Sequence, residues 1–126
     1  MITVYYYNNY DNCMCGDFDW DYLFPERNLA NRMLFDWAFK LFAETDNDIV
    51  VVTTSEVIIA ALRYVVLNDF KMPNEVVIMY DEEHIIEINT YGVVLEYPEG
   101  FLDTLELIED DILDLAMRKY ERDALV

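Results

Sequence analysis

The acidic residues between positions 17 and 21 are spaced in a way that could bind a metal ion. Asp17, Asp19 and Asp21 alternate along this segment, and such carboxylates supply the oxygen ligands that Ca²⁺ prefers. An EF-hand loop beginning at Asp17 would also need glycine at position 22 and glutamate at position 28, where the chain has Tyr22 and Asn28. We therefore expect a solvated acidic loop with no metal site. An enzyme that uses this loop with a divalent metal ion is the third of three hypotheses.

The other groups that could do chemistry stand alone. Cys13 and Cys15 are two positions apart, which suits a disulfide poorly, and with one distant His84 they do not make a zinc site. The chain has three glycines and no Gly-x-x-x-x-Gly-Lys-Ser/Thr loop to hold a phosphate. We therefore expect no catalytic residue, no cofactor and no ATP hydrolysis by the isolated chain. The two thiols favour a reducing cytoplasm.

The charge of the chain indicates what kind of partner it could have. The net charge is −18, from 26 acidic and 8 basic residues, and residues 72–117 contain no lysine or arginine. Such a field repels nucleic acid, so we expect no direct nucleic-acid binding and a protein partner with a basic surface, such as a nuclease or an ATPase. The alternative for the acids of the last helix is a solvated face. The candidate partner-binding residues are Asp17, Asp19, Trp20, Asp21, Glu106, Glu109, Asp110, Asp111 and Asp114.

The hydrophobic pattern predicts one α/β domain over residues 1–126. Its small sheet should have three parallel strands joined by helices, because right-handed crossovers connect strands that alternate with helices. An antiparallel meander and a C-terminal helix should follow. No apolar run approaches the ~20 residues of a membrane span, so we expect no membrane association. Strands are expected over residues 2–7, 49–53, 75–80, 84–89 and 93–97, and helices over residues 25–44, 55–68 and 102–122.

Two separated segments carry a resemblance to a known family. Residues 48–62, DIVVVTTSEVIIAAL, and residues 91–103, YGVVLEYPEGFLD, resemble the last third of the SMC-like or ABC-type AAA ATPases. In that family a strand ends in a Thr-His-Ser-Glu switch, and a C-terminal extension carries Gly…Trp-Pro-Glu-Gly-Phe-Phe-Asp. The resemblance extends over roughly residues 22–113. It implies the scaffold of the C-terminal lobe of such an ATPase.

The same alignment places other residues where the family keeps its phosphate-engaging groups. Thr54 stands in place of the switch histidine, and Phe24 replaces the histidine of a Leu-His-Pro element. Asn8 and Asn9 stand where the family has the two Walker B acids, and asparagine lacks the charge that binds Mg²⁺. The resemblance therefore implies a scaffold that has lost the groups needed for nucleotide chemistry.

Two further hypotheses follow, and they belong to different classes. The first is a non-catalytic acidic binding module, an inhibitor or decoy carried by a phage or mobile element. It would imitate either an ATPase subunit or the charge of DNA. The second is a subunit that completes an ABC-type ATPase whose other half lies on another polypeptide. The sequence does not indicate an oligomeric state.

Overall fold

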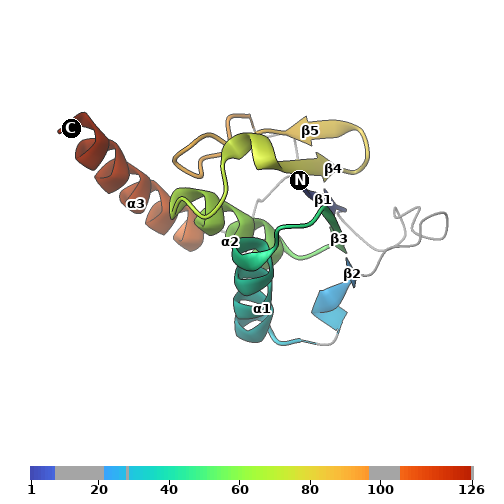
Figure 1. Ribbon diagram of the computed structural model, residues 1–126. Coiled ribbons are helices and arrows are strands. Elements are labelled where there is room, and N and C mark those ends of the chain that lie inside the picture. The colour runs from blue at the N-terminus through green and yellow to red at the C-terminus, as the bar shows by residue number, and fades with distance from the viewer. Residues whose placement is uncertain (8–21, 28, 97–105, 126) are drawn as a thin grey trace.

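The computed structural model of the chain describes residues 1–7, 22–27, 29–96 and 106–125, with backbone alone for 106–111 (Figure 1). Its centre is a five-stranded sheet in the order β2-β3-β1-β4-β5. The first four strands in that order are parallel, and β5 is antiparallel to β4. The strands are β1 (Ile2–Tyr6), β2 (Tyr22–Leu23), β3 (Ile49–Thr53), β4 (Val76–Tyr80) and β5 (His84–Ile86).

One face of the sheet, here called the first face, packs against two helices. The register places Val4 beside Val51 on one side and Ile78 on the other, and all three are fully buried. These side chains form one apolar cluster with helices α1 (Asn31–Glu44) and α2 (Glu56–Leu67). The strand residues of the first face in this cluster are Ile2, Val4, Tyr6, Tyr22, Ile49, Val51, Val76, Ile78, Tyr80 and Ile86.

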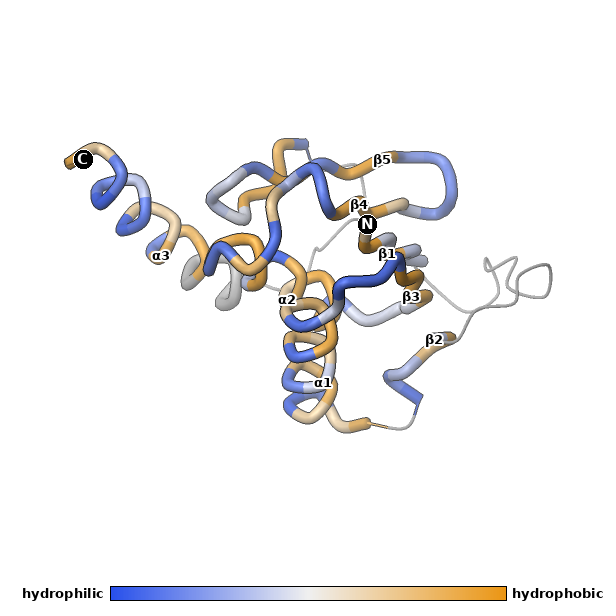
Figure 2. The backbone as a smooth tube through the Cα atoms, viewed as in Figure 1, coloured by the Kyte–Doolittle hydropathy of each residue, from blue (hydrophilic) through white to orange (hydrophobic). Residues whose placement is uncertain are grey.

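Helix α2 is the centre of the fold because other elements surround it. Figure 2 shows α2 as mostly hydrophobic, whereas the exposed helix α3 (Glu106–Ala124) alternates between hydrophilic and hydrophobic residues. The loop at residues 89–93 also lies on α2, where the Nε of Arg63 donates a 2.7 Å hydrogen bond to the carbonyl oxygen of Gly92. Gly92 has a φ of +71°, and a Cβ there would lie 2.7 Å from the carbonyl oxygen of Arg63. Glycine therefore permits this close approach.

Both crossover helices lie on the same side of the sheet (Figure 1). The helical connections run from β2 through α1 to β3, and from β3 through α2 past β1 to β4. Two crossovers that run in the same direction over one face of a sheet have the same hand. This agrees with the expectation that the crossovers share the usual right-handed sense. A consequence is that neither crossover helix covers the other face.

The predicted fold class is confirmed, and its boundaries need four corrections. Helix α1 begins at Asn31, because residues Pro25–Arg27 form a separate 3-10 turn and Ala30 is extended. The two-residue strand β2 was not predicted. Strand β5 ends at Ile86, three residues earlier than expected. The third strand of the meander is reduced to one bridge, between Ile88 and Val94, within the part of the chain that is described.

Candidate functional site

The carboxyl ends of the parallel strands are where ligands bind in open α/β sheets, and the Thr-Thr-Ser-Glu segment lies there. Strand β3 ends at Thr53 and helix α2 begins at Glu56, as predicted. Ser55 is extended and its side-chain oxygen accepts a 3.2 Å hydrogen bond from the backbone N–H of Val57, so Ser55 is the N-cap of α2, as its place at the start of the expected helix indicates. The start of a buried helix is a position that could hold an anion.

The chain's own Glu26 carboxylate occupies this position. Its Oε1 accepts hydrogen bonds from the backbone N–H of Thr54 at 2.7 Å and from the Thr54 hydroxyl at 2.9 Å. Its Oε2 accepts a third, from the Thr53 hydroxyl at 2.9 Å. A phosphate approaching Thr54 would meet a carboxylate that already uses these donors and that repels it. This arrangement is a structural clasp between the turn at residues 25–27 and the end of β3.

A second pair closes the same edge of the sheet beside β1. The Tyr7 hydroxyl donates a 2.7 Å hydrogen bond to Oε1 of Glu82. Burial, followed by the hydrogen bond to this carboxylate, raises the pKa of Tyr7 far above its usual range, so the phenol stays protonated. Phe24, which has a φ of +48°, packs with Tyr7 and Val52. Side-chain packing and hydrogen bonds therefore fill the described part of this edge.

Most of the predicted partner-binding residues fall outside what the structure describes. Asp17, Asp19, Trp20 and Asp21 lie outside the described residues, as do Asn8, Asn9 and residues 97–103 of the resemblance. The backbone of Glu106, Glu109, Asp110 and Asp111 lies on α3, but their side chains are outside the described set.

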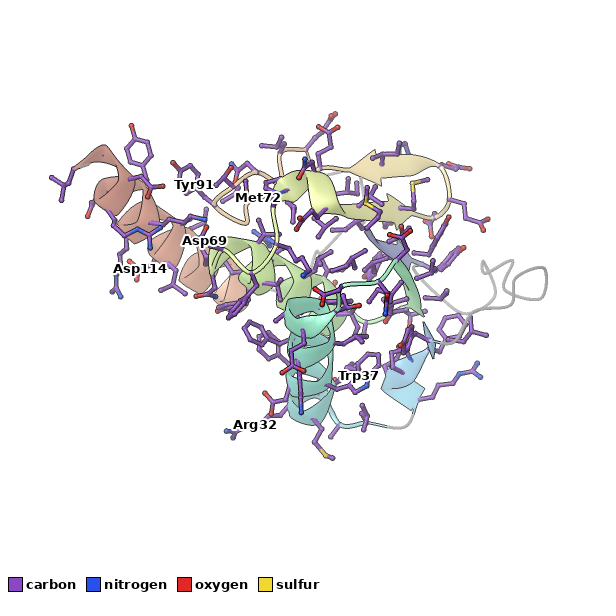
Figure 3. All side chains as sticks on the ribbon, viewed as in Figure 1. Arg32, Trp37, Asp69, Met72, Tyr91 and Asp114 are labelled. Atoms are coloured by element: carbon purple, nitrogen blue, oxygen red, sulfur yellow. The ribbon has the colours of Figure 1, made fainter. Side chains whose placement is uncertain are left out.

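Asp114 is the predicted contact residue whose side chain is described. It is exposed on α3 and forms a 3.0 Å ion pair with Arg118, one helical turn away (Figure 3). Such an exposed pair on a helix is typical of a solvated face. That these acids bind a partner stays a prediction.

The structure also reveals a surface that the sequence did not indicate, here called the second face. It is the side of the sheet opposite the two crossover helices. The described residues that pack there, Tyr7, Phe24 and Val52 with Tyr5 beside them, belong to no helix. Its side chains, given by the alternation of the strands, are Leu23, Thr3, Tyr5, Val50, Val52, Val77, Met79, Ile85, Glu87 and Leu95.

Exposure on the second face increases toward β5. Val52 is fully buried, whereas Val77 and Met79 are half-buried. Ile85 is 63% exposed and Leu95 is 61% exposed. Both side chains therefore expose apolar surface to water at the edge of the sheet. Contiguous apolar surface of this kind is typical of a site that binds another molecule.

A hollow of about 340 Å³ lies beside Ile85 and Leu95, at the end of the sheet where β4 begins. The backbone N–H of Leu95 donates a 3.0 Å hydrogen bond to the carbonyl oxygen of Glu87, so the two side chains stand next to each other. Glu87 makes no ion pair or side-chain hydrogen bond with the described residues. The hollow is lined by Pro73, Asn74, Val76, Val77, Ile85, Ile86, Glu87, Ile88 and Leu95.

A larger groove, of about 500 Å³, lies between α1 and α2 on the helical side of the molecule. Phe35 stacks on Phe39 with ring centroids 6.1 Å apart and meets Tyr64 edge-on at 5.5 Å. Asp36 also lines this groove, and Arg32 and Lys40 are exposed one turn away on the same helix. Its surroundings therefore carry both signs of charge.

In the described part of the chain, no group of three His, Cys, Asp or Glu residues could hold a metal ion. None of the helices described is both long enough and apolar enough to cross a bilayer. Comparisons with protein families, curated proteins and solved structures found no match to this chain.

Proposed function

We propose that this chain is a non-catalytic protein-binding module that docks on a basic partner protein through its second face. The observation that carries the proposal is that this face is apolar and, in the described residues, has no helix on it. Parallel strands are normally covered on both faces, so a bare face is a surface on which another protein can complete the layer.

The charges around the part of this face formed by β4 and β5 favour a basic partner. Between positions 72 and 117, every residue with a charged side chain at neutral pH is acidic. The acids on or beside β4 and β5 are Glu75, Asp81, Glu82, Glu83, Glu87 and Glu96. An apolar centre inside an acidic rim fits a partner with aliphatic side chains surrounded by lysine and arginine, and the charge speeds its approach.

The clasp made by Glu26 supports a binding role over catalysis. Thr54, which the resemblance places at the switch histidine, already donates to this carboxylate from both its N–H and its hydroxyl. In this proposal the module keeps an ATPase-like scaffold and acts in the cytoplasm as a phage or mobile-element inhibitor or decoy. Its partner is a nuclease or an ATPase, which it engages by imitating a subunit or the charge of DNA.

The proposal is tested by capturing the partner with variants of matched exposure. Ile85 and Met33 are 63% and 60% exposed, on the second face and on α1 respectively. We expect Ile85→Lys to abolish capture of a basic protein from host lysate at low salt, and Met33→Lys to leave it unchanged. The wild-type interaction should weaken as salt is raised. Capture that Met33→Lys abolishes and Ile85→Lys leaves intact would place the interface elsewhere, and no basic or ATPase partner at low salt would refute the proposal.

The second face, on which no helix lies among the described residues, also favours one second candidate. A chain that completes an ABC-type ATPase with another polypeptide would also leave one side of its sheet for that polypeptide to cover. A neighbouring gene that encodes a Walker A loop would identify the partner. If the chain is such a subunit, adding it to that partner should change ATP turnover, and unchanged turnover would exclude this role.

A further inference from the structure

The hollow beside Glu87 has the two properties that an arginine side chain requires. Its walls are the aliphatic side chains of Val77, Ile85 and Leu95, and one carboxylate stands among them. Arginine lays its methylene stem along apolar surface and presents a flat guanidinium, which binds a carboxylate through two parallel hydrogen bonds. A volume of about 340 Å³ is large enough for one such side chain.

Glu87 is available to that side chain. Its carboxylate has no partner in the described part of the chain, whereas Glu26 and Glu82 are held by Thr53, Thr54 and Tyr7. No lysine or arginine lies within 15 residues of it in the sequence. Asn74, also in the lining, adds an amide that can accept a further N–H.

We propose that the hollow formed by Val77, Ile85, Glu87 and Leu95 is a specific subsite for one arginine side chain of the partner. This inference rests on the proposed function, since it names the residue by which a basic partner would anchor on the second face. Arginine is among the residues that contribute most when buried at the centre of an interface. Lysine fits the hollow less well, because its ammonium is a compact, strongly hydrated charge with no planar surface to lay on the apolar walls.

The experiment uses the full chain and short capped peptides, acetyl-Gly-Leu-Xaa-Leu-Gly-amide, in which Xaa is arginine, lysine or citrulline. Citrulline has nearly the shape of arginine without its charge. Binding is followed by two-dimensional NMR, through the backbone amide signals of Val77, Ile85 and Leu95. We expect the arginine peptide to bind at least about tenfold more tightly than the citrulline peptide, which is the usual effect of a charge-assisted hydrogen bond.

Two variants decide whether Glu87 is the cause. Glu87→Gln should remove the preference for arginine, and Glu83→Gln, at an exposed acid outside the hollow, should retain it. Equal binding of arginine and citrulline, a preference that survives in Glu87→Gln, or equal binding of lysine would each overturn the subsite. The proposed function fails separately: if Ile85→Lys abolishes capture of the partner and Glu87→Gln does not affect it, the docking face stands and the arginine subsite does not.

Discussion

Val77 and Ile78 are neighbours on β4 and belong to opposite faces of the sheet. Ile78 is fully buried under α1 and α2, whereas Val77 is half-buried and lines the hollow on the second face. Both are branched aliphatic residues, so side-chain type does not cause the difference. The cause is the path of the chain, which places both crossover helices on the first face.

The largest effect that this comparison predicts is a difference in the stability of two alanine variants. Ile78→Ala removes a side chain from a packed core and should lower the free energy of unfolding by about 2–4 kcal/mol. Val77→Ala removes a half-exposed side chain and should cost less than about 1 kcal/mol. Urea unfolding followed by circular dichroism measures both. Similar losses in the two variants would mean that the second face is covered in solution as well as the first.

The next effect tests how the carboxyl edge of the sheet is held closed. Glu26→Gln replaces a carboxylate that accepts three hydrogen bonds, and hydrogen bonds to charged groups are the stronger kind. We expect a loss of about 1–3 kcal/mol in the free energy of unfolding. Glu83→Gln makes the same change at an exposed side chain and serves as the control. Equal stability of the two variants would show that the clasp contributes nothing, which would leave this edge open to ligands.

The sequence predicted the parts of the fold that depend on local patterns. The Ser55 cap and the continuous apolar run of β3 follow from neighbouring residues, and both are present. Pro25 was expected to begin a helix, but residues 25–27 form a separate turn, in which Glu26 accepts hydrogen bonds from Thr53 and Thr54. These donors lie 27 and 28 positions away in the sequence, so a pattern of neighbouring residues cannot predict the contact.

The second face was missed for a related reason. The apolar run of β3 predicts burial on both sides, as in most parallel sheets, and β4 has a similar apolar run. The structure buries Ile78 fully and Val77 by half, because the direction in which the chain crosses the sheet decides where the helices lie. Hydrophobic periodicity carries no information about that direction. In the sequence Glu87 likewise resembles any surface acid, because its neighbour Leu95 comes beside it only in the folded chain.

A smaller effect should be seen where α3 joins α2 on the helical side. The Nζ of Lys119, a nearly buried side chain, donates 2.7 Å hydrogen bonds to Oδ1 of Asp69 and to the carbonyl oxygen of Thr90. Its ammonium also lies 5.7 Å from the centre of the Tyr91 ring, and Asp69 and Tyr91 flank this junction in Figure 3. The hydrogen bond from Lys119 holds the pKa of Asp69 below its usual value of 3.8.

A folded-state pKa below the unfolded value means that the ionised carboxylate stabilises the folded protein. That stabilisation is complete above about pH 5 and is lost as the pH falls through the pKa of Asp69. Asp69→Asn should therefore lower stability at pH 7 by about 1 kcal/mol or less, since the carboxylate is half exposed. Because that folded-state pKa lies below 3.8, the loss should be smaller at pH 3 than at pH 7. Urea unfolding at the two pH values measures it, with Asp46→Asn, at an exposed acid, as the control. An effect of Asp69→Asn that is equal at both pH values would contradict the assignment.

The smallest expected effect on stability concerns Asp114, and it separates the solvated-face interpretation from the partner-binding one. Asp114→Asn breaks an exposed ion pair with Arg118, which should cost about 0.3–0.5 kcal/mol. If Asp114 only solvates α3, capture of the basic partner should stay unchanged, and the second face alone would account for binding. If capture weakens while urea unfolding hardly changes, the acids of α3 belong to the docking surface together with Ile85. The partner would then have to reach around the sheet to the helical side, and a partner that binds through one flat surface would be excluded.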